Sequence, residues 1–410
     1  MNNTLSPSPR EIILNLVEVV RLAAEADSPQ NPAAHAKLLT AIQKLQIAAE
    51  TPMESILRLL FLVCIPVPEA RDPQQDVALE VAVDMGLLEF IVANGGQPIN
   101  ASELSEKSGG ATLLIVRIMR VLTATGICQE VAEDTYLAND LAIAITEGGK
   151  DGVHHLFDMA FPTAAKLPEY LHSVGYQNPE DPVASPFAYT FGAPVFEWIK
   201  RNPAEQAVFN AYMAARRKGR PSWFDIFPVE DSLGPEWPGG NADAVLLVDV
   251  GGNCGHDLIK FKERCPQISG RLILEDLPQV VADLHLKHEG IELMAYDFCT
   301  PQPVKGARFY YFRAIFHDWP DHTCRKILQN TIPAMAKGHS KLIISEFVLP
   351  NTGAPLLPCL LDIQMMGLQA GRERTEKEWR ALLDSVGLVI AKIWTIEPGT
   401  ESVIEAELKD

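Results

Sequence analysis

The feature that most constrains the fold is an alternation of strand-like and helix-like segments from residue 244 to the C-terminus. AVLLVDV (244–250) and RLILEDL (271–277) are apolar runs typical of buried strands, and HDLIKFKERC (256–265) between them has helical spacing. Four more runs have the composition of strands: ARFYYFRAI, KLIISEFVLP, LVIAKIW and ESVIEAEL. Strands that alternate with helices form open, mostly parallel sheets covered on both faces. The C-terminal part is therefore predicted to be a doubly wound α/β fold.

The N-terminal part has helical apolar spacing in place of the strand–helix alternation. Apolar residues recur at helical spacing in EIILNLVEVVRLAAEA and HAKLLTAIQKLQIAAE, which predicts helices before a polar, proline-rich joint at 66–75. A further helix is expected with one apolar face and an end at Gly95 and Gly96; the face would comprise Val77, Val81, Met85, Leu88 and Val92. A short helix in ASELSEKSG, capped by Asn100 or Ser102, a helix in LLIVRIMRVLTATG and a small β-wing around Glu133 and Asp134 complete a winged helix.

These two sequence patterns predict the domain organisation. Residues 1–150 are predicted to form a helical arm and the winged helix, and residues 151–410 a helical covering segment followed by the α/β domain. Between residues 74 and 140 there are three basic and ten acidic residues, and the whole chain has a formal net charge of -18. Nucleic acids attract proteins through a cationic surface, so the winged helix is interpreted as a structural or dimerisation unit. The same charge argues against binding to anionic membranes.

Cysteine usage and the N-terminus indicate the compartment. The seven cysteines are scattered and form no CxxC pair, as is typical of free thiols in a reducing environment. The first residues, MNNTLSPSPR, lack the basic and apolar regions of a secretion signal. The longest apolar run, Ile56–Val67, is shorter than the ~20 residues of a bilayer span and is interpreted as a buried or interface helix. A cytoplasmic homodimer, joined through the N-terminal helices and the winged helix, is expected.

Candidate binding residues follow successive strands of the α/β part. Asp249 ends the first strand, and Gly251 and Gly252 form a turn in which a ligand can approach main-chain N–H groups closely. Asp276 ends the next strand, where related folds place a carboxylate against ribose hydroxyls, and the Asp297–Phe298 pair follows a third strand-like segment. Each acid alone could equally be a strand-end cap. Three acids in corresponding positions favour a binding site.

Candidate catalytic residues lie further along the chain. His317, Glu346 and Glu373 each lie near the end of a predicted strand or in a loop, so a base with two orienting carboxylates is one interpretation. A hydrogen-bonded structural histidine is the other. His154–His155 and His256–Asp257 have no third ligand at a recognisable spacing, and no metal site is predicted.

Several motifs occur together in order: LLVDVGGNCGHD, LEDLP, YDFCTPQP, FRAIFHDWPD, SEFVLP and GRERTEKEW. From about Asp76 to the C-terminus the chain resembles the S-adenosylmethionine-dependent O-methyltransferases of the plant caffeate type and their fungal secondary-metabolism relatives. The resemblance implies the Rossmann-like sheet of class I methyltransferases and a winged-helix dimerisation domain. Residues 1–70 resemble the longer N-terminal arm of the fungal members.

The resemblance also implies roles for the candidate residues. The glycine turn after Asp249 would surround the methionine part of S-adenosylmethionine, Asp276 would hold the ribose, and Asp297 with Phe298 would hold the adenine. His317 would be the general base, flanked and oriented by Glu346 and Glu373, and Arg313 is a further cofactor-binding candidate. Asn253 stands where family members often have a third glycine, although asparagine tolerates left-handed backbone.

The chemistry implied is metal-free methyl transfer to a phenolic or enolic hydroxyl of an aromatic or polyketide-like small molecule. A phenol of pKa ~10 needs a base, which a histidine held by carboxylates supplies. The alternative is a pericyclase or dehydratase that binds S-adenosylmethionine without consuming it. Asn253 and the bulky Phe316 beside the base are compatible with this alternative. In it, Arg313, His154 and His155 would act as donors to a substrate carbonyl. A non-enzymatic winged-helix regulator is a third, disfavoured class.

Overall fold

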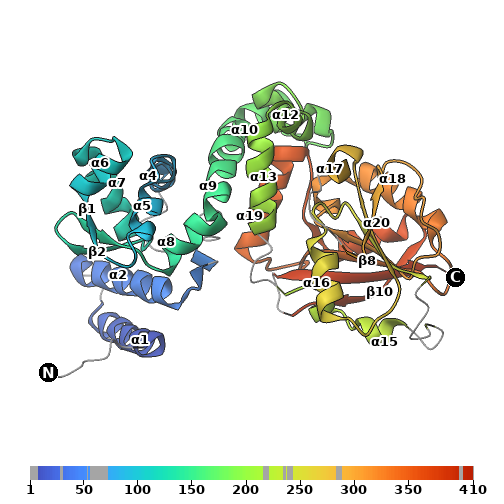
Figure 1. Ribbon diagram of the computed structural model, residues 1–410, viewed down its shortest axis with the longest axis horizontal. Helices are drawn as coiled ribbons and strands as arrows, with labels where there is room; N and C mark the ends of the chain where they lie inside the picture. The colour runs from blue at the N-terminus through green and yellow to red at the C-terminus, as the bar shows by residue number, and fades with distance from the viewer. Residues whose placement is uncertain are drawn as a thin grey trace. The chain divides into compact units, whose positions relative to one another are not determined.

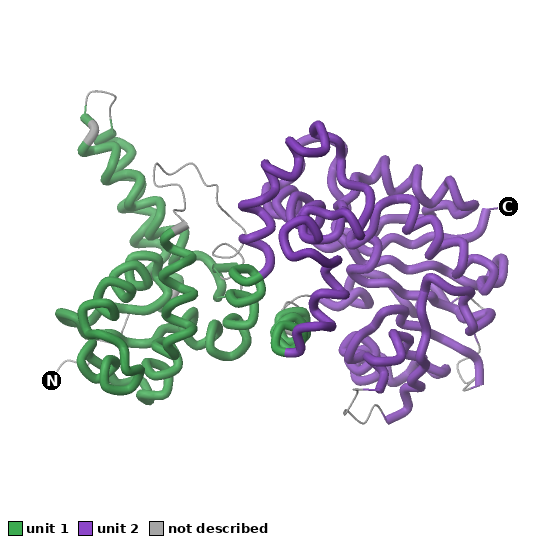
Figure 2. The backbone as a smooth tube through the Cα atoms, turned by 90° about the horizontal axis from the view of Figure 1, so that it is seen from above, with its two compact units in different colours: residues 1–158, 204–216 green, residues 159–203, 217–410 purple. Residues whose placement is uncertain are grey.

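The computed structural model describes residues 8–27, 31–52, 54–55, 73–215, 221–233, 237, 243–282, 289–396 and 400–409. The chain forms two compact units, which are coloured separately in Figure 2. Unit 1 contains residues 1–158 and 204–216, and unit 2 contains residues 159–203 and 217–410. These units differ from the domains expected from the sequence, because the first break falls after Asp158 and residues 204–216 return to unit 1.

Unit 1 begins with the two helices expected from the apolar spacing, α1 (Pro9–Ala26) and α2 (Pro32–Ala49). Ser8 caps α1 in a reciprocal capping box with Glu11, and Asn31 caps α2 through the N–H of Ala34. The run Ile56–Val67 lies outside the described residues. No helix in the described ranges is long and apolar enough to cross a membrane.

The winged helix is present in unit 1. Its strands form an antiparallel sheet of order β1-β3-β2, and Asn100, one of the two expected cap residues, caps the helix Ala101–Ser108 together with Glu103. Its elements are α4 (Pro73–Asp84), α5 (Leu87–Ala93), β1 (Ile99–Asn100), α6 (Ala101–Ser108), α7 (Thr112–Ala124), β2 (Gln129–Ala132) and β3 (Thr135–Leu137). Unit 1 also contains α8 (Asp140–Ala144), η1 (Ile145–Gly149), α9 (Lys150–His155) and most of α13 (Pro203–Ala215).

The single helix expected over residues 77–92 is wrong in two respects. Gly86 adopts a left-handed backbone (φ 67°) and divides the segment into α4 and α5. The buried face of α4 contains Ala78, Leu79, Ala82 and Val83, whereas Val77 is 44% exposed. The periodicity identified a helix correctly, but alanines supplied part of the contact face that larger apolar residues were expected to supply.

Unit 2 is built around a sheet of order β10-β11-β8-β7-β4-β5-β6, with β9 paired to β8. Figure 1 labels β8 and β10 of this sheet. The strands from β6 to β8 in this order are parallel. At the other edge, β11 pairs antiparallel with β8, and β10 pairs antiparallel with β11. The strands are β4 (Val245–Val250), β5 (Arg271–Asp276), β6 (Glu292–Ala295), β7 (Phe309–Arg313), β8 (Lys341–Leu349), β9 (Arg374–Thr375), β10 (Leu388–Trp394) and β11 (Glu401–Leu408). The expected doubly wound α/β fold is confirmed.

Helices cover both faces of this sheet. One apolar cluster joins the sheet to α18 (Asp321–Thr331) and α20 (Glu376–Asp384), and a second joins it to α14 (Trp223–Ile226) and α16 (His256–Arg264). The chain passes from unit 1 to unit 2 within η2 (Leu156–Ala160). The remaining elements of unit 2 are α10 (Phe161–Ser173), η3 (Pro182–Ala184), α11 (Pro186–Phe191), α12 (Val195–Arg201), α15 (Val229–Leu233), α17 (Pro278–Ala282), η4 (Phe316–Asp318), η5 (Ile332–Ala334) and α19 (Leu356–Gln369).

The strand order positions the candidate site. From β4 the chain proceeds outward to β5 and β6, and then returns to β7 on the other side of β4. In open α/β sheets, ligands bind at the carboxyl ends of the strands where the order reverses in this way. The candidate residues lie at or just after the carboxyl ends of β4, β5, β6 and β7, within β8, and directly before β9.

Candidate active site

The glycine turn after β4 is held tightly to the neighbouring strand. The N–H groups of Gly251 and Gly252 donate to the carbonyl oxygen of Glu275, at 2.8 and 3.3 Å. A Cβ atom added to Gly252 would lie 2.5 Å from Oδ2 of Asp249, so this position requires glycine. Asn253 adopts a left-handed backbone (φ 53°), the conformation that asparagine tolerates. The turn therefore brings main-chain N–H groups and the buried Asp249 to the carboxyl end of the central strand.

Asp276 joins the end of β5 to the glycine turn. Its Oδ2 accepts the N–H of Asn253 at 2.8 Å, and its Oδ1 accepts the N–H of Leu277 at 2.7 Å. Burial raises the pKa of this carboxyl, although the two N–H donors act in the opposite direction. Each oxygen keeps a second lone pair for further donors. The carboxylate is thus fixed in direction at the edge of the turn.

Asp297 and Phe298 follow β6. Asp297 is exposed, and its Oδ1 accepts the N–H of Cys299 at 2.8 Å, which forms a local turn. The ring of Phe298 packs edge-on against Trp319, with centroids 6.2 Å apart, and Cε1 of Phe298 lies 4.0 Å from the position of a Cβ on Gly251. The structure therefore brings the Asp–Phe pair next to the glycine turn.

His317 lies in the one-turn helix η4 after β7. Its Nδ1 is 2.8 Å from Oε1 of Glu373, and its Nε2 is 3.6 Å from Oδ1 of Asp318. Burial by itself lowers the pKa of His317, but the charges of Glu373 and Asp318 outweigh it, and the pKa is raised above its ordinary value. Nδ1 faces a fully buried carboxylate, whose side chain is 0% exposed, and therefore carries the proton.

Glu346 supports His317 through the main chain. Its Oε1 accepts the N–H groups of Ile315, Phe316 and His317 at 3.0, 2.6 and 3.3 Å. Of the two carboxylates expected beside the ring, Glu373 is the one that contacts it, and Glu346 fixes the backbone that carries it. Burial raises the pKa of Glu346 to about 7.

Two buried oxygens of this cluster accept no hydrogen bond from the described part of the chain: Oε2 of Glu346 and Oε2 of Glu373. Buried carboxylate oxygens without donors are energetically unfavourable. These two oxygens therefore need hydrogen-bond donors or a positive charge nearby, and this need suits a histidine that takes up a proton.

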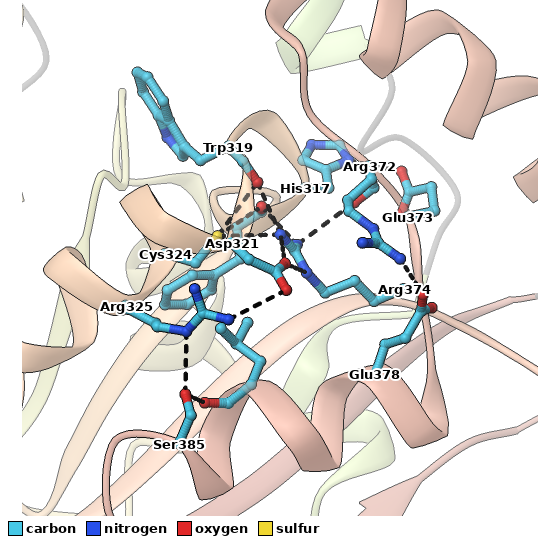
Figure 3. Close-up of polar contacts among 12 residues, drawn as sticks. His317, Trp319, Asp321, Cys324, Arg325, Arg372, Glu373, Arg374, Glu378 and Ser385 are labelled. Atoms are coloured by element: carbon cyan, nitrogen blue, oxygen red, sulfur yellow. Dashed lines mark hydrogen bonds and ion pairs between the residues drawn. The ribbon is translucent and has the colours of Figure 1, made fainter. Parts of the chain in front are cut away.

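Arg374 is a residue of this region that the sequence analysis missed. Its guanidinium donates to the carbonyl oxygens of Phe316 and Trp319, each at 2.8 Å, and to Oδ1 of Asp321 at 3.0 and 2.9 Å (Figure 3). Its side chain is 0% exposed. The motif GRERTEKEW contains Arg374, but charged residues are rarely buried completely, so the motif alone offered no reason to expect a buried arginine. Arg374 fixes the turn on both sides of His317.

Gly371 permits the approach of this loop to His317. A Cβ on Gly371 would collide with the carbonyl oxygen of His317, which also accepts the N–H of Arg372 at 2.8 Å. The segment that carries Glu373 can therefore lie against the turn only with glycine at this position.

Arg313 and Phe316 have surroundings that differ from the sequence interpretation. The guanidinium of Arg313 binds Glu401 at 2.7 and 2.9 Å and Asp257 at 3.0 Å. Phe316 is completely buried and packs in the core, 5.1 Å from Phe312 by ring centroids, so its bulk does not favour the alternative activity. A cofactor role for Arg313 stays a prediction, because the contacts found explain its position as part of an ion-pair network.

The two histidines of α9 belong to unit 1. Nδ1 of His154 lies 2.9 Å from Glu80, and the buried ring of His155 stacks on Tyr212 with centroids 4.8 Å apart. No group of three His, Cys, Asp or Glu side chains within the described ranges could hold a metal ion. Metal-free chemistry remains a prediction.

Sequence comparisons identify relatives over nearly the whole chain. Residues 242–389 match the model of an O-methyltransferase domain. The methyltransferase cfoC of Aspergillus candidus is 36% identical over 97% of both chains. The demethylsterigmatocystin 6-O-methyltransferase of Aspergillus flavus is 32% identical over 90% of this chain and 92% of its own.

Structural comparisons find solved proteins that match this chain over nearly its whole length. A protein described as a pericyclic reaction enzyme and LepI in complex with S-adenosylmethionine each have a TM-score of 0.79 and 28% identity, covering 98% of this chain and 100% of theirs. OxaC in complex with S-adenosylhomocysteine and oxaline has a TM-score of 0.76 and 28% identity with the same coverage. Together with the motifs and the strand order, these relatives show that the chain belongs to the plant-type family of S-adenosylmethionine-dependent O-methyltransferases, in its fungal secondary-metabolism branch.

Proposed function

We propose that this chain transfers the methyl group of S-adenosylmethionine to a hydroxyl of a phenolic or enolic secondary metabolite, with His317 as general base. The observation that carries the proposal is the buried contact between Nδ1 of His317 and Glu373 at 2.8 Å. It fixes the ring and leaves Nε2 as the nitrogen that accepts the hydroxyl proton. Glu373 then stabilises the imidazolium that forms.

The cofactor is assigned to the segments that follow β4, β5 and β6. Gly251 and Gly252, behind Asp249, offer close main-chain approach for the methionine part, and the fixed carboxylate of Asp276 suits the two hydroxyls of a ribose. Asp297 and Phe298 would hold the adenine through a carboxylate and an aromatic face. These residues fit the cofactor because the turn has no side chain in its way and Asp276 keeps accepting capacity.

His317 must be neutral before it can accept the proton of the substrate hydroxyl. With its raised pKa, the imidazole is charged at neutral pH and cannot accept a proton. When bound, S-adenosylmethionine would supply an activated methyl group and a positive charge, and a positive charge near the site would favour the neutral form of His317. The carboxylates then hold the neutral ring in position for the incoming hydroxyl.

The substrate class follows from the relatives. One relative is named for the 6-O-methylation of demethylsterigmatocystin, and OxaC has been solved with oxaline. We therefore propose an aromatic or polyketide-like small molecule as the substrate of this chain.

A homodimer through unit 1 is part of the proposal. Leu14 and Leu22 of α1 and Leu113 of α7 are 57%, 52% and 69% exposed, an unusual exposure for large apolar side chains. A partner subunit would remove them from water. Light scattering at micromolar concentration should give twice the chain mass, and a monomer would contradict the proposal.

The second candidate is a cofactor-dependent pericyclase or dehydratase. Two observations favour it: the similarity to a pericyclic reaction enzyme, and the raised pKa of His317, which suits a proton donor. The contacts of Arg313 with Asp257 and Glu401 weigh against its use as a donor to a substrate carbonyl. Methyl transfer is therefore preferred.

The deciding experiment counts S-adenosylhomocysteine against product. Metabolite extracts and a panel of phenols are incubated with the protein and S-adenosylmethionine, and both products are quantified by mass spectrometry. Methyl transfer gives a ratio of one and a mass gain of one methylene. H317A should lower turnover roughly 10²–10⁴-fold, whereas H322A, at an exposed position on α18, is the matched control. Product without S-adenosylhomocysteine would establish the second candidate.

A further inference from the structure

Glu275, the residue before Asp276, is completely buried at the carboxyl end of β5 (0% exposed). Its Oε2 accepts a hydrogen bond of 2.8 Å from Nε2 of Gln302, which is also 0% exposed. Gln302 lies 27 residues away in the segment between β6 and β7. Such a polar pair is unfavourable to bury unless its hydrogen bonds are made, so its presence under a candidate ligand site calls for a functional reason.

The strand end at Glu275 and Asp276 is itself the ribose segment, and it contacts the other two segments assigned to the cofactor. The main-chain oxygen of Glu275 accepts the N–H groups of Gly251 and Gly252. The main-chain oxygen of Asp276 accepts the N–H of Tyr296 at 2.8 Å, where the adenine segment begins. The side chain of Glu275 binds Gln302, where that segment ends.

Gln302 is itself fixed in direction. Its Oε1 accepts the N–H of Val304 at 2.9 Å, which orients the amide so that Nε2 points to Glu275. Its main-chain N–H donates to the carbonyl of Asn330 at 3.0 Å, and the side chain of Asn330 donates to the carbonyl of Phe298 at 3.1 Å. The segment with Asp297 and Phe298 is thus held at both ends and in its middle.

We infer that Glu275 and Gln302 are positioning residues whose buried hydrogen bond holds the adenine-binding segment against the ribose-binding strand end and thereby sets the affinity for the adenosyl part of the cofactor. This inference rests on the proposed function. Among the described contacts, neither residue hydrogen-bonds to His317. Breaking the pair should therefore weaken cofactor binding and leave the chemistry at His317 intact.

The test uses calorimetry with S-adenosylhomocysteine and, separately, with adenosine. The substitution Q302E places two buried carboxylates opposite each other. At pH 8 the affinities for S-adenosylhomocysteine and for adenosine should both fall by about tenfold or more. The exchanged double variant E275Q/Q302E restores a donor and an acceptor in reversed order and should bind both ligands within about threefold of wild type. If Q302E does not fold, Q302N, which shortens the side chain by one methylene, gives the same readout.

The matched control is S340A. Ser340 is buried, and its hydroxyl donates to the carbonyl of Ala307 at 2.6 Å before β7 and β8 begin, at the amino-terminal edge of the sheet. Its loss should lower the melting temperature without changing the affinity for either ligand. Wild-type affinity in folded Q302E, or no recovery in the exchanged double variant, would overturn the inference. Failure of the wild-type protein to bind S-adenosylhomocysteine would instead overturn the proposed function.

Discussion

Replacement of Glu373 by glutamine tests whether this carboxylate keeps His317 in its charged form. The substitution preserves the size of the side chain and an oxygen acceptor opposite Nδ1 of His317, but it removes the negative charge 2.8 Å away. Asp318 and Glu346 remain, so only one of the charges that raise the pKa of His317 is lost.

The size of the effect follows from the contact. A hydrogen bond to a charged partner contributes about 1.5–3 kcal/mol and one between neutral groups about 0.5–1.5 kcal/mol. The difference of about 1–2 kcal/mol corresponds to roughly one unit of pKa. Because the pair is buried, water replaces little of this interaction. The pKa of His317 should therefore fall by about one unit in E373Q.

The assay needs no substrate. Selective ¹⁵N labelling of the ten histidines and a pH titration by NMR report each imidazole, and the signal absent from H317N identifies His317. In the wild-type protein this signal should titrate above the reference value of about 6.5. H322A provides a spectrum in which a different, exposed histidine is removed.

Stability gives an independent readout with a defined sign. A histidine with a raised folded-state pKa contributes stability that is fully present below about pH 6.5 and is lost as the pH rises toward the folded value of about 10. The unfolding free energy of the wild-type protein should therefore fall between pH 7.5 and 9, and less steeply in E373Q. An unchanged pKa of His317 in folded E373Q, or a wild-type value below 6.5, would show that Glu373 does not hold His317 in its charged form.

Three further predictions concern the remaining parts of the site. D276N should weaken S-adenosylhomocysteine binding about tenfold to a hundredfold in calorimetry; unchanged affinity in a folded variant would remove Asp276 from the site. R374K loses the planar, multiply bonded guanidinium and should lower the unfolding free energy by about 3 kcal/mol in urea titrations, and a loss below 1 kcal/mol would show that the guanidinium contacts do not hold the turn. Burial raises the pKa of Glu275 to about 7, so its stabilising contribution is present below about pH 4.5 and is lost as the pH rises to 7. E275Q should therefore reduce the decline in unfolding free energy between pH 4.5 and 7 by up to about 3 kcal/mol. Parallel plots of unfolding free energy against pH for the two proteins would contradict this.

Local patterns accounted for most of the elements and for the ligand segments. The alternation from residue 244 specified the parallel strands, because apolar period and length report burial along a strand without reference to its neighbours. Capping chemistry at Asn100 and the glycine turn after Asp249 were equally local, so they could be identified from adjacent residues. The helix over residues 77–92 failed because one glycine in left-handed conformation outweighed the apolar period.

The contacts that complete the site were decided by the tertiary structure alone. Glu373 reaches His317 across 56 residues, Arg374 reaches Phe316 across 58, and Gln302 reaches Glu275 across 27. Nothing in the sequence separates the carboxylate that binds the ring from Glu346, which binds the main chain, because both are buried acids near the end of a strand or in a loop. The sheet order and the packing of the 371–374 loop against η4 make that choice. Sequence determined which chemical groups the site contains, and tertiary packing determined which of them meet, since partners far apart along the chain leave no periodic signal.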